Sequence, residues 1–337
     1  MFFDTVKKVF VFLIAGCLIA AATACSPARR PGPDETKTRV EEGEEELEKP
    51  PIPEAISRGE GKEPVLKVYD VKSKEIKELP IEQYLEGVVA GEMKNDWPDA
   101  ALEAQAMIAR TFVLKFIQDK KGSKYEGAHV STDIEEAQAW NAEAVNDKVK
   151  TAINKTRGMV MVYEGEYPNA WFHAHAGGIT ASAKEGLNYD EEEPPYIQVK
   201  KSPDSPKAPK EDREWTARFS KAELLDALKK AGKEPDAIRQ IKIGKKGPSG
   251  RAVTLLVNDV EVSTPELRIA LGSTEMKSTL LSDLGVEGDT IWMKGKGYGH
   301  GVGMSQWGAY GMAEEGKSAV DIIKYYFKDI RLVRLWD

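Results

Sequence analysis

Residues 79–93 read LPIEQYLEGVVAGEM, and this stretch predicts the helix around which the chain is organised. Pro80 suits the first turn of a helix, where its missing N–H would have no partner anyway. At helical spacing, one face of the segment carries Ile81, Leu85, Val88 and Glu92. A carboxyl group therefore stands where the pattern calls for an apolar side chain.

Glu92 is the first candidate for catalysis. A carboxyl group buried on an apolar face resists ionisation, so we expect a raised pKa. A carboxyl group that is still protonated near neutral pH can act as a general acid. The chain is thus a candidate for cleaving a bond whose leaving group needs a proton. The alternative is a helix that ends at Glu92 and turns the carboxylate to solvent.

The composition limits the class of protein and its partners. The chain has 337 residues, 41% of them hydrophobic and 31% charged, which is typical of a soluble globular protein. Its net charge is -7 and much of the negative excess lies in residues 34–48, so the sequence has no basic field for nucleic acid. A neutral or weakly charged polymer fits better. The two cysteines, Cys17 and Cys25, both lie near the N-terminus, so we expect neither an internal disulfide nor a thiolate metal site in the folded part.

The first 25 residues predict export and attachment to a membrane. Two lysines precede an apolar run, residues 9–24, that has about the length of a signal h-region. The run ends in Ala22-Thr23-Ala24-Cys25, which resembles a bacterial lipobox, so Cys25 is the expected lipidation site. The alternative is an uncleaved single-pass anchor. Both place the rest of the chain outside the cytoplasm and tethered to a membrane.

The remaining chain divides into a spacer and a folded part. Residues 26–61 are rich in proline and charge and predict a disordered linker. Residues 62–337 mix helical and strand patterns without βαβ regularity, so we expect one α+β domain of helices and antiparallel hairpins. Three pairs of strands are predicted, each pair joined by a turn: 65–70 with 75–79, 158–163 with 167–176, and 241–243 with 252–257. The predicted helices are 80–92, 98–118, 142–152, 221–231, 265–271, 305–313 and 318–327. Residues 190–212 predict a long loop that serves as a rim or lid.

Glycine alternates with other residues in the segment 295–303, GKGYGHGVG. If this segment is extended, one of its faces has no side chains, and another backbone or a flat ligand can approach closely. Tyr298 and His300 would lie on the opposite face, and Ser305, Gln306 and Trp307 follow at once. These residue types suit a sugar site. The alternative is a flexible loop with an incidental histidine.

A second polar cluster is WFHAHAGG at residues 171–178. On a strand, His173 and His175 point the same way and could bind a metal ion. Lining of a substrate cleft and a purely structural role are the other interpretations, and both are favoured over metal. Gly177 and Gly178 predict a tight turn beside the site.

Two other kinds of catalytic motif are poorly supported by the sequence. Residues 311–318, GMAEEGKS, fit a phosphate-binding loop, but that loop must follow a buried strand and this region is predicted to be helical. No serine sits in a G-x-S-x-G turn and the folded part has no cysteine, so a Ser or Cys nucleophile is poorly supported.

Four blocks together resemble the SpoIID/LytB family. They are 79–112 with VVAGEM, FH and GG between 172 and 178, ELR with LG between 266 and 272, and GYGHGVGMSQWGA at 297–309. The resemblance runs from about residue 64 to the C-terminus and implies a lytic transglycosylase acting on peptidoglycan, in sporulation or cell-wall remodelling, on glycan strands already stripped of stem peptides by a partner amidase. It implies that Glu92 is catalytic. Some relatives hold zinc through Cys and His, but the folded part of this chain has no Cys, so we expect no metal or other cofactor. The residues expected to hold the glycan are Arg110, His173, Gly177, Gly178, Tyr298, His300, Ser305, Gln306 and Trp307.

Two alternatives to a lytic transglycosylase remain open from the sequence. One is a non-catalytic module that binds glycan and enhances an amidase, because family members named for that role share the same motifs. The other is a hydrolase, which usually needs two carboxylates. The single-carboxylate pattern at Glu92 favours the lytic reaction.

Overall fold

The structure of the protein is a computed structural model that describes residues 48–337. The predicted signal or anchor segment, with Cys25, and the first part of the predicted linker lie outside the described residues. The rest of that linker is ordered: Ile56 is 3% exposed in the main core and Gly61 bridges to Trp336. The folded part therefore begins before residue 62, where the sequence predicted its start. Within the described residues, no helix has the length and apolar character needed to cross a membrane.

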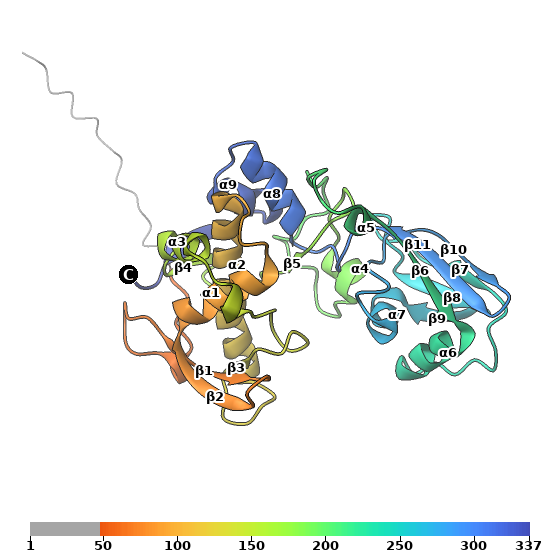
Figure 1. The fold of residues 1–337 in the computed structure, drawn as a ribbon, viewed down its shortest axis with the longest axis horizontal. Coiled ribbons are helices and arrows are strands. Elements are labelled where there is room, and N and C mark those ends of the chain that lie inside the picture. The colour runs from red at the N-terminus through yellow and green to blue at the C-terminus, as the bar shows by residue number, and fades with distance from the viewer. Residues whose placement is uncertain (1–47) are drawn as a thin grey trace, which may run out of the picture. The chain divides into compact units, whose positions relative to one another are not determined.

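Helices and short strands alternate along the described chain, and the α+β class is confirmed (Figure 1). The α-helices are α1 (Ile81–Glu92), α2 (Asp99–Lys120), α3 (Asp147–Lys155), α4 (Ala183–Leu187), α5 (Lys210–Arg213), α6 (Lys221–Lys230), α7 (Thr264–Leu271), α8 (Gln306–Glu314) and α9 (Ala319–Tyr326). Two short 3-10 helices are η1 (Glu54–Ile56) and η2 (Ala142–Ala144). The strands are β1 (Val65–Asp70), β2 (Glu75–Pro80), β3 (Val130–Ser131), β4 (Met159–Val162), β5 (Phe172–His173), β6 (Glu214–Ser220), β7 (Ile241–Ile243), β8 (Thr254–Val257), β9 (Val260–Ser263), β10 (Leu281–Glu287), β11 (Thr290–Lys296), β12 (Met304–Ser305) and β13 (Arg331–Arg334).

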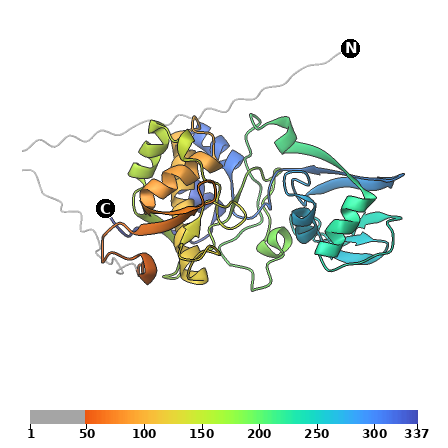
Figure 2. The same cartoon turned by 60° about the horizontal axis from the view of Figure 1, so that its bottom comes forward.

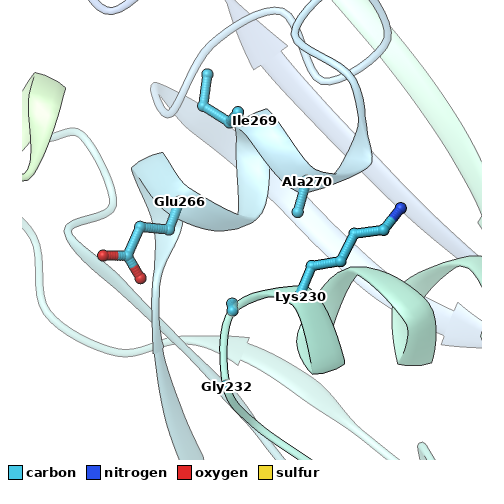
Figure 3. A pocket seen from close by; sticks show the side chains of 6 residues that line it. Lys230, Gly232, Glu266, Ile269 and Ala270 are labelled. Atoms are coloured by element: carbon cyan, nitrogen blue, oxygen red, sulfur yellow. The ribbon is translucent and has the colours of Figure 1, made fainter.

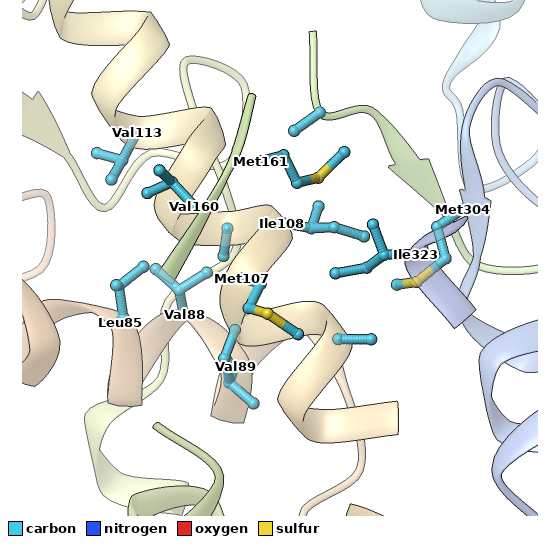
Figure 4. Close-up of a cluster of buried hydrophobic side chains, with 14 of the residues drawn as sticks. Leu85, Val88, Val89, Met107, Ile108, Val113, Val160, Met161, Met304 and Ile323 are labelled. Atoms are coloured by element: carbon cyan, nitrogen blue, oxygen red, sulfur yellow. The ribbon is translucent and has the colours of Figure 1, made fainter. Parts of the chain in front are cut away.

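The main hydrophobic core forms around α1 and α2 (Figure 4). Ile81, Leu85 and Val88 are fully buried, which confirms the apolar face predicted for α1. The long helix α2 packs against α1, α3, α8 and α9, so helices from both ends of the described chain lie side by side (Figures 1 and 2). The helix that carries Glu92 therefore rests on a rigid, buried support.

Small sheets flank this core, and one predicted pairing was wrong. The hairpin of β1 and β2 is confirmed, with β3 added in parallel to β1. Residues 158–163 and 167–176, however, do not form a hairpin. The first segment supplies β4, which pairs with β13 at the C-terminus, and the second supplies β5, which pairs in parallel with β12. Sequence periodicity predicts that a strand forms, but not which distant strand pairs with it.

The pairing of β5 with β12 brings the two polar motifs of the sequence together. Phe172 lies opposite Met304, and His173 lies opposite Ser305. Immediately before β12, the backbones of His175 and Tyr298 exchange hydrogen bonds of 2.8 and 2.9 Å. Residues 171–178 and 297–307, more than a hundred positions apart, thus form one structural unit.

A second hydrophobic cluster is built from β6 to β11 with α6 and α7. The predicted hairpin is confirmed, because β7 and β8 pair antiparallel, and β9 extends the sheet. A further sheet has the order β10-β11-β6. This part of the chain supplies Arg251 and Arg268, whose side chains reach back to the glycine-rich segment.

The remaining helix predictions hold with shifted ends. The predicted helix 142–152 starts later, as α3 at Asp147, and η2 precedes it. Ser318 caps α9 in a capping box with Asp321, as its sequence predicted. The first half of the segment that resembles a phosphate-binding loop, residues 311–314, lies on α8, which confirms the helix predicted at 305–313.

Candidate active site

Glu92 is the last residue of α1, and its side chain is half-buried. The helix ends there because Met93 takes an extended conformation, after which the chain leads into α2. One carboxyl oxygen, Oε1, accepts a 2.7 Å hydrogen bond from the backbone N–H of Ala139. Glu92 is therefore held by the protein, in contrast to the alternative in which its carboxylate is free in solvent.

Burial raises the pKa of Glu92 to about 7. Hydrogen bonds from the Ala139 amide and the Gln306 side chain act in the opposite direction, because they stabilise the carboxylate. The position at the C-terminal end of a helix, where the helix dipole is negative, also disfavours a carboxylate. The predicted rise in pKa is confirmed, and near neutral pH a large fraction of Glu92 carries the proton that a general acid donates.

Gln306 bonds to this carboxyl group, and two further glutamines are linked to its partners. Gln306 approaches Gln105 on α2, with 3.5 Å between Nε2 of the former and Oε1 of the latter. Gln138 lies next to Ala139, and its Nε2 is 3.5 Å from the carbonyl oxygen of Ala109. Nε2 of Gln105 and Oε1 of Gln138 are buried and have no hydrogen-bond partner among the described residues. Buried polar atoms normally have partners, so these two indicate a place where water or a ligand binds.

A second carboxyl group, Glu136, stands three residues before Ala139 and was not singled out from the sequence. The buried hydroxyl of Tyr84 has its pKa raised by burial and then by the charges of both Glu92 and Glu136. Glu136 already accepts hydrogen bonds from Ser123 Oγ, Lys124 N and Ser131 Oγ. Its oxygens are thus occupied by the protein. No periodic pattern marks this loop residue.

An aromatic cluster stands beside Gln306. The rings of Trp97 and Trp307 are 4.5 Å apart and both side chains are 6% exposed, so Trp307 presents little of its ring to a sugar. Tyr310, on the next turn of α8, packs against both and is half-buried. Lys94 lies 5.9 Å from the centre of the Trp307 ring. Trp307 therefore positions Gln306 through packing, and Tyr310 is the more exposed ring.

The glycine-rich segment is not extended, contrary to the expectation from alternation. Gly297, Gly299, Gly301 and Gly303 have φ values of 79°, 107°, 86° and 71°. A Cβ atom at Gly297 would lie 2.6 Å from the carbonyl oxygen of His175, and one at Gly303 would lie 2.0 Å from that of Trp171. The glycines thus allow close approach of the protein's own backbone. Tyr298 is half-buried, with Lys277 Nζ 4.9 Å from its ring centre.

His173 and His300 are neighbours, with ring centres 5.7 Å apart. Burial lowers the pKa of both, that of His300 to about 3, so both are neutral at physiological pH. Nδ1 of His173 donates to the Val302 carbonyl oxygen at 3.1 Å, while Nδ1 of His300 accepts from the Val302 N–H at 3.0 Å. Nε2 of His173 is then a buried acceptor without a partner among the described residues. It can receive a hydrogen bond from a hydroxyl group.

The Gly177–Gly178 turn is organised by Asp204, which lies in the predicted loop 190–212. Asp204 accepts hydrogen bonds from the Gly178 N–H at 2.9 Å and from Ser305 Oγ at 2.6 Å. Ser305 is fully buried and also caps α8, so its hydroxyl is engaged within the protein. A cavity of about 480 Å³ opens here; its lining includes His175, Gly177, Gly178, Asp204, Lys210 and Arg213.

Arg110 requires a correction. Its side chain is 0% exposed and pairs with Glu82, with hydrogen bonds of 3.1 Å from Nε and 2.5 Å from Nη2. Glu82 also accepts from the N–H of Gly158 and from the indole N–H of Trp336, both at 2.9 Å. Arg110 therefore ties α2 to α1 and to the C-terminus, and it cannot reach a ligand. The sequence did not reveal this partner.

Another hollow belongs to the second hydrophobic cluster. A cavity of about 730 Å³ lies between α6 and α7, with Lys230, Glu266 and Ile269 in its lining (Figure 3). Glu266 bonds to Asn188, and Lys230 pairs with Asp226. Among the residues that the structure describes, no group of three His, Cys, Asp or Glu side chains is arranged to hold a metal ion.

Comparison with known proteins is consistent with this geometry. A family model described as Stage II sporulation protein (SpoIID) matches residues 69–163, and one for a domain of unknown function (DUF8618) matches residues 187–303. The first match includes Glu92, Gln105 and Ala139.

Relatives match over most of the chain. It is 30% identical to Stage II sporulation protein D of Bacillus amyloliquefaciens, over 82% of this chain and 82% of that protein. It is 31% identical to Stage II sporulation protein D of Bacillus subtilis (strain 168), over 79% and 78%. It is also 28% identical to a protein of that strain named Amidase enhancer, over 72% of this chain and 39% of that protein. The chain therefore belongs to the SpoIID family.

Proposed function

We propose that this protein is a peptidoglycan lytic transglycosylase, which cleaves between N-acetylmuramic acid and N-acetylglucosamine. The observation that carries the proposal is the state of Glu92, a half-buried carboxyl group with a pKa of about 7. Glu136 already accepts three hydrogen bonds, from Ser123, Lys124 and Ser131. A reaction that needs one carboxyl group for two proton transfers fits this arrangement better than one that needs a second carboxylate.

The reaction begins with Glu92 in its protonated form. Glu92 donates its proton to the glycosidic oxygen, the bond from that oxygen to C1 of the muramic acid breaks, and the N-acetylglucosamine leaves with a free hydroxyl. The Glu92 carboxylate then takes the proton from the C6 hydroxyl of the same muramic acid, whose oxygen bonds to C1. The products are a 1,6-anhydro end and a protonated Glu92, and no water is consumed.

The side chains around Glu92 are proposed to position the sugar ring for the reaction. Proton transfer by one placed group contributes roughly 10²–10⁴-fold, so the remaining acceleration requires that the sugar ring be held correctly. Gln306 bonds to the Glu92 carboxyl group, and Gln105 and Gln138 have free buried amide atoms. The Gln306 amide suits the acetamido groups and hydroxyls of the substrate, whereas Gln105, which is 0% exposed, contacts Gln306 from within the core.

The decisive experiment compares wild-type protein with Glu92→Gln on purified sacculi and on amidase-stripped glycan. Mass spectrometry should find 1,6-anhydro ends with the wild type and none with Glu92→Gln, while binding to insoluble glycan is retained. Glu86→Gln, a half-buried position on the same helix, is the matched control and should keep activity. Undiminished release of anhydro ends by Glu92→Gln would end the proposal, and reducing ends in the wild-type digest would indicate a hydrolase.

A second candidate function is enhancement of a cell-wall amidase by glycan binding alone. The observation in its favour is the similarity to the protein named Amidase enhancer. It predicts that wild-type protein and Glu92→Gln stimulate release of stem peptides by an added amidase equally, without new glycan ends. Stimulation that is lost with Glu92→Gln would count against it.

The cellular setting is part of the proposal. Relatives named Stage II sporulation protein D support a role at the cell wall during sporulation. The N-terminal pattern supports an extracytoplasmic protein held at the membrane through Cys25 or an uncleaved anchor. Metabolic labelling with a radioactive fatty acid, compared between wild type and Cys25→Ala, separates lipidation from an anchor.

A further inference from the structure

A groove of about 260 Å³ lies between α2 and residues 169–171, outside the set of residues predicted from the sequence. Phe112, Phe116 and Trp171 line it, and all three side chains are half-buried. Phe112 and Phe116 are one turn apart on α2, and their rings lie within 15° of parallel with centres 6.4 Å apart. Trp171 is held edge-on by Tyr189 at 5.3 Å. The groove thus presents aromatic rings in fixed orientations.

Polar groups stand around these rings. Asn169 and Glu136 belong to the lining, as do Lys115 and Asp119, which form an ion pair of 3.0 Å. Binding sites for small molecules typically combine aromatic walls with a few placed polar groups. A pyranose ring has the matching surface, because its C–H faces are apolar and its edge carries hydroxyls.

Two short stretches of chain connect the groove with the surroundings of Glu92. Glu136 lines the groove, while Ala139, three residues later, donates to the Glu92 carboxyl group. Three residues of extended chain span at most about 10 Å. The second route is α2, on which Gln105 and Phe112 are separated by about 10 Å of helix. Both routes place the groove within the reach of a few linked sugars from Glu92.

The region between the groove and Glu92 contains polar atoms that lack partners. Gln138 lies between Glu136 and Ala139, and it touches α2 at Ala109. Its Oε1, Nε2 of Gln105 and the hydroxyl of Tyr84 are buried and have no partner among residues 48–337. Because these three side chains are at most 2% exposed, ordered water rather than the strand itself would satisfy their polar atoms.

We infer that the groove lined by Phe112, Phe116 and Trp171 binds sugar residues of the same glycan strand that is held at Glu92, several residues away from the bond to be cleaved. The inference rests on the proposed function, because that function identifies the bound strand as peptidoglycan glycan. It assigns the protein a preference for long strands over short ones, because only a long strand fills both places.

The test measures binding separately from cleavage. Glu92→Gln serves as the background, and its affinity for short and long oligomers of N-acetylglucosamine is measured by calorimetry. Phe116→Ala or Trp171→Ala in this background should weaken binding of the long oligomer about tenfold, which corresponds to about 1.4 kcal/mol, and leave the short one unchanged. Phe116→Tyr and Trp171→Phe keep a ring and should retain most of the affinity. Trp292→Ala, a half-buried tryptophan on β11, is the matched control.

The outcomes distinguish sugar binding in the groove from bond cleavage at Glu92. If folded Phe116→Ala and Trp171→Ala, checked by their thermal transitions, bind the long oligomer as tightly as their background, the groove is not a sugar site. If both oligomers lose affinity equally, the groove does not lie apart from the cleavage site and the inference also fails. If binding of the long oligomer falls as expected but the wild type releases no anhydro ends, sugar binding in the groove is supported and the proposed reaction is overturned.

Discussion

The backbone N–H of Ala139 donates a 2.7 Å hydrogen bond to Oε1 of Glu92. A protonated carboxyl group that accepts on one oxygen carries its proton on the other, so this bond directs the acidic hydrogen to Oε2. Because Ala139 lies in the segment that leads from the aromatic groove, the same segment orients the acid and lines the path of the proposed glycan. A backbone donor cannot be removed by substitution of its own side chain, so its effect is best tested through its partners.

The first prediction concerns Gln306. Its side chain stabilises the Glu92 carboxylate and lowers the pKa of that group, so Gln306→Leu should raise the pKa further. Since activity needs protonated Glu92, kcat/KM falls as pH rises through this pKa, and the alkaline limb of the pH profile should move to higher pH. Gln83→Leu, an exposed glutamine on α1, should leave the limb in place. A limb that does not move with Gln306→Leu would show that Glu92 is not the titrating acid.

The second prediction links the same group to stability. The pKa of Glu92 is raised from 4.5 to about 7 in the folded state, so between these values the folded state binds more protons than the unfolded one. Stability should therefore fall as pH rises from about 4.5 to about 7. Glu92→Gln cannot ionise and so does not lose this stability, which amounts to about 3 kcal/mol.

Thermal unfolding of wild type and Glu92→Gln over a pH series measures this difference. The two proteins should have similar Tm values at about pH 5, and the variant should become more stable above about pH 7. A constant difference across the series would mean that the carboxyl group of Glu92 is not buried in solution.

Local sequence patterns were sufficient to predict the helix α1 and the raised pKa of Glu92. The spacing of Ile81, Leu85 and Val88 predicted the buried face, and Glu92 on that face predicted a raised pKa. Both follow from helix geometry and desolvation within a short segment, which is why they could be anticipated. The positions of Gln306 and Trp307 beside this helix needed the family resemblance, because they lie more than two hundred residues further along the chain.

The parts that could not be anticipated depend on long-range pairing. Arg110 looked available for a ligand until Glu82 was found to neutralise it in the core. Alternating glycines suggested an extended strand, yet the approach of Trp171 and His175 requires positive φ at those glycines. Asp204 sits in a loop without periodicity, and nothing in its neighbourhood of sequence identifies the turn at Gly178 that it stabilises.

The third prediction tests the structural role of Arg110. Arg110→Met leaves the Glu82 carboxylate buried without its cation, so the free energy of unfolding should fall by about 3–5 kcal/mol. The double variant Arg110→Met with Glu82→Gln removes the uncompensated charge and should recover part of the loss. Urea denaturation measures both. Normal stability combined with lost glycan affinity in Arg110→Met would restore the original interpretation of Arg110 as a ligand-binding residue.

The last prediction concerns Gly303, where the glycine-rich segment meets β5. Gly303 has a φ of 71°, and a Cβ atom there would lie 2.0 Å from the Trp171 carbonyl oxygen, so Gly303→Ala must displace backbone. Gly316 has a φ of 82° with nothing within 4 Å of its Cβ position, so Gly316→Ala isolates the conformational cost, about 1 kcal/mol. We expect Gly303→Ala to lower the free energy of unfolding by more than about 3 kcal/mol, and equal effects of the two would contradict the close packing of this segment on Trp171. Because Val302 holds both His173 and His300, any Gly303→Ala protein that folds should also lose glycan affinity, whereas Gly316→Ala should not.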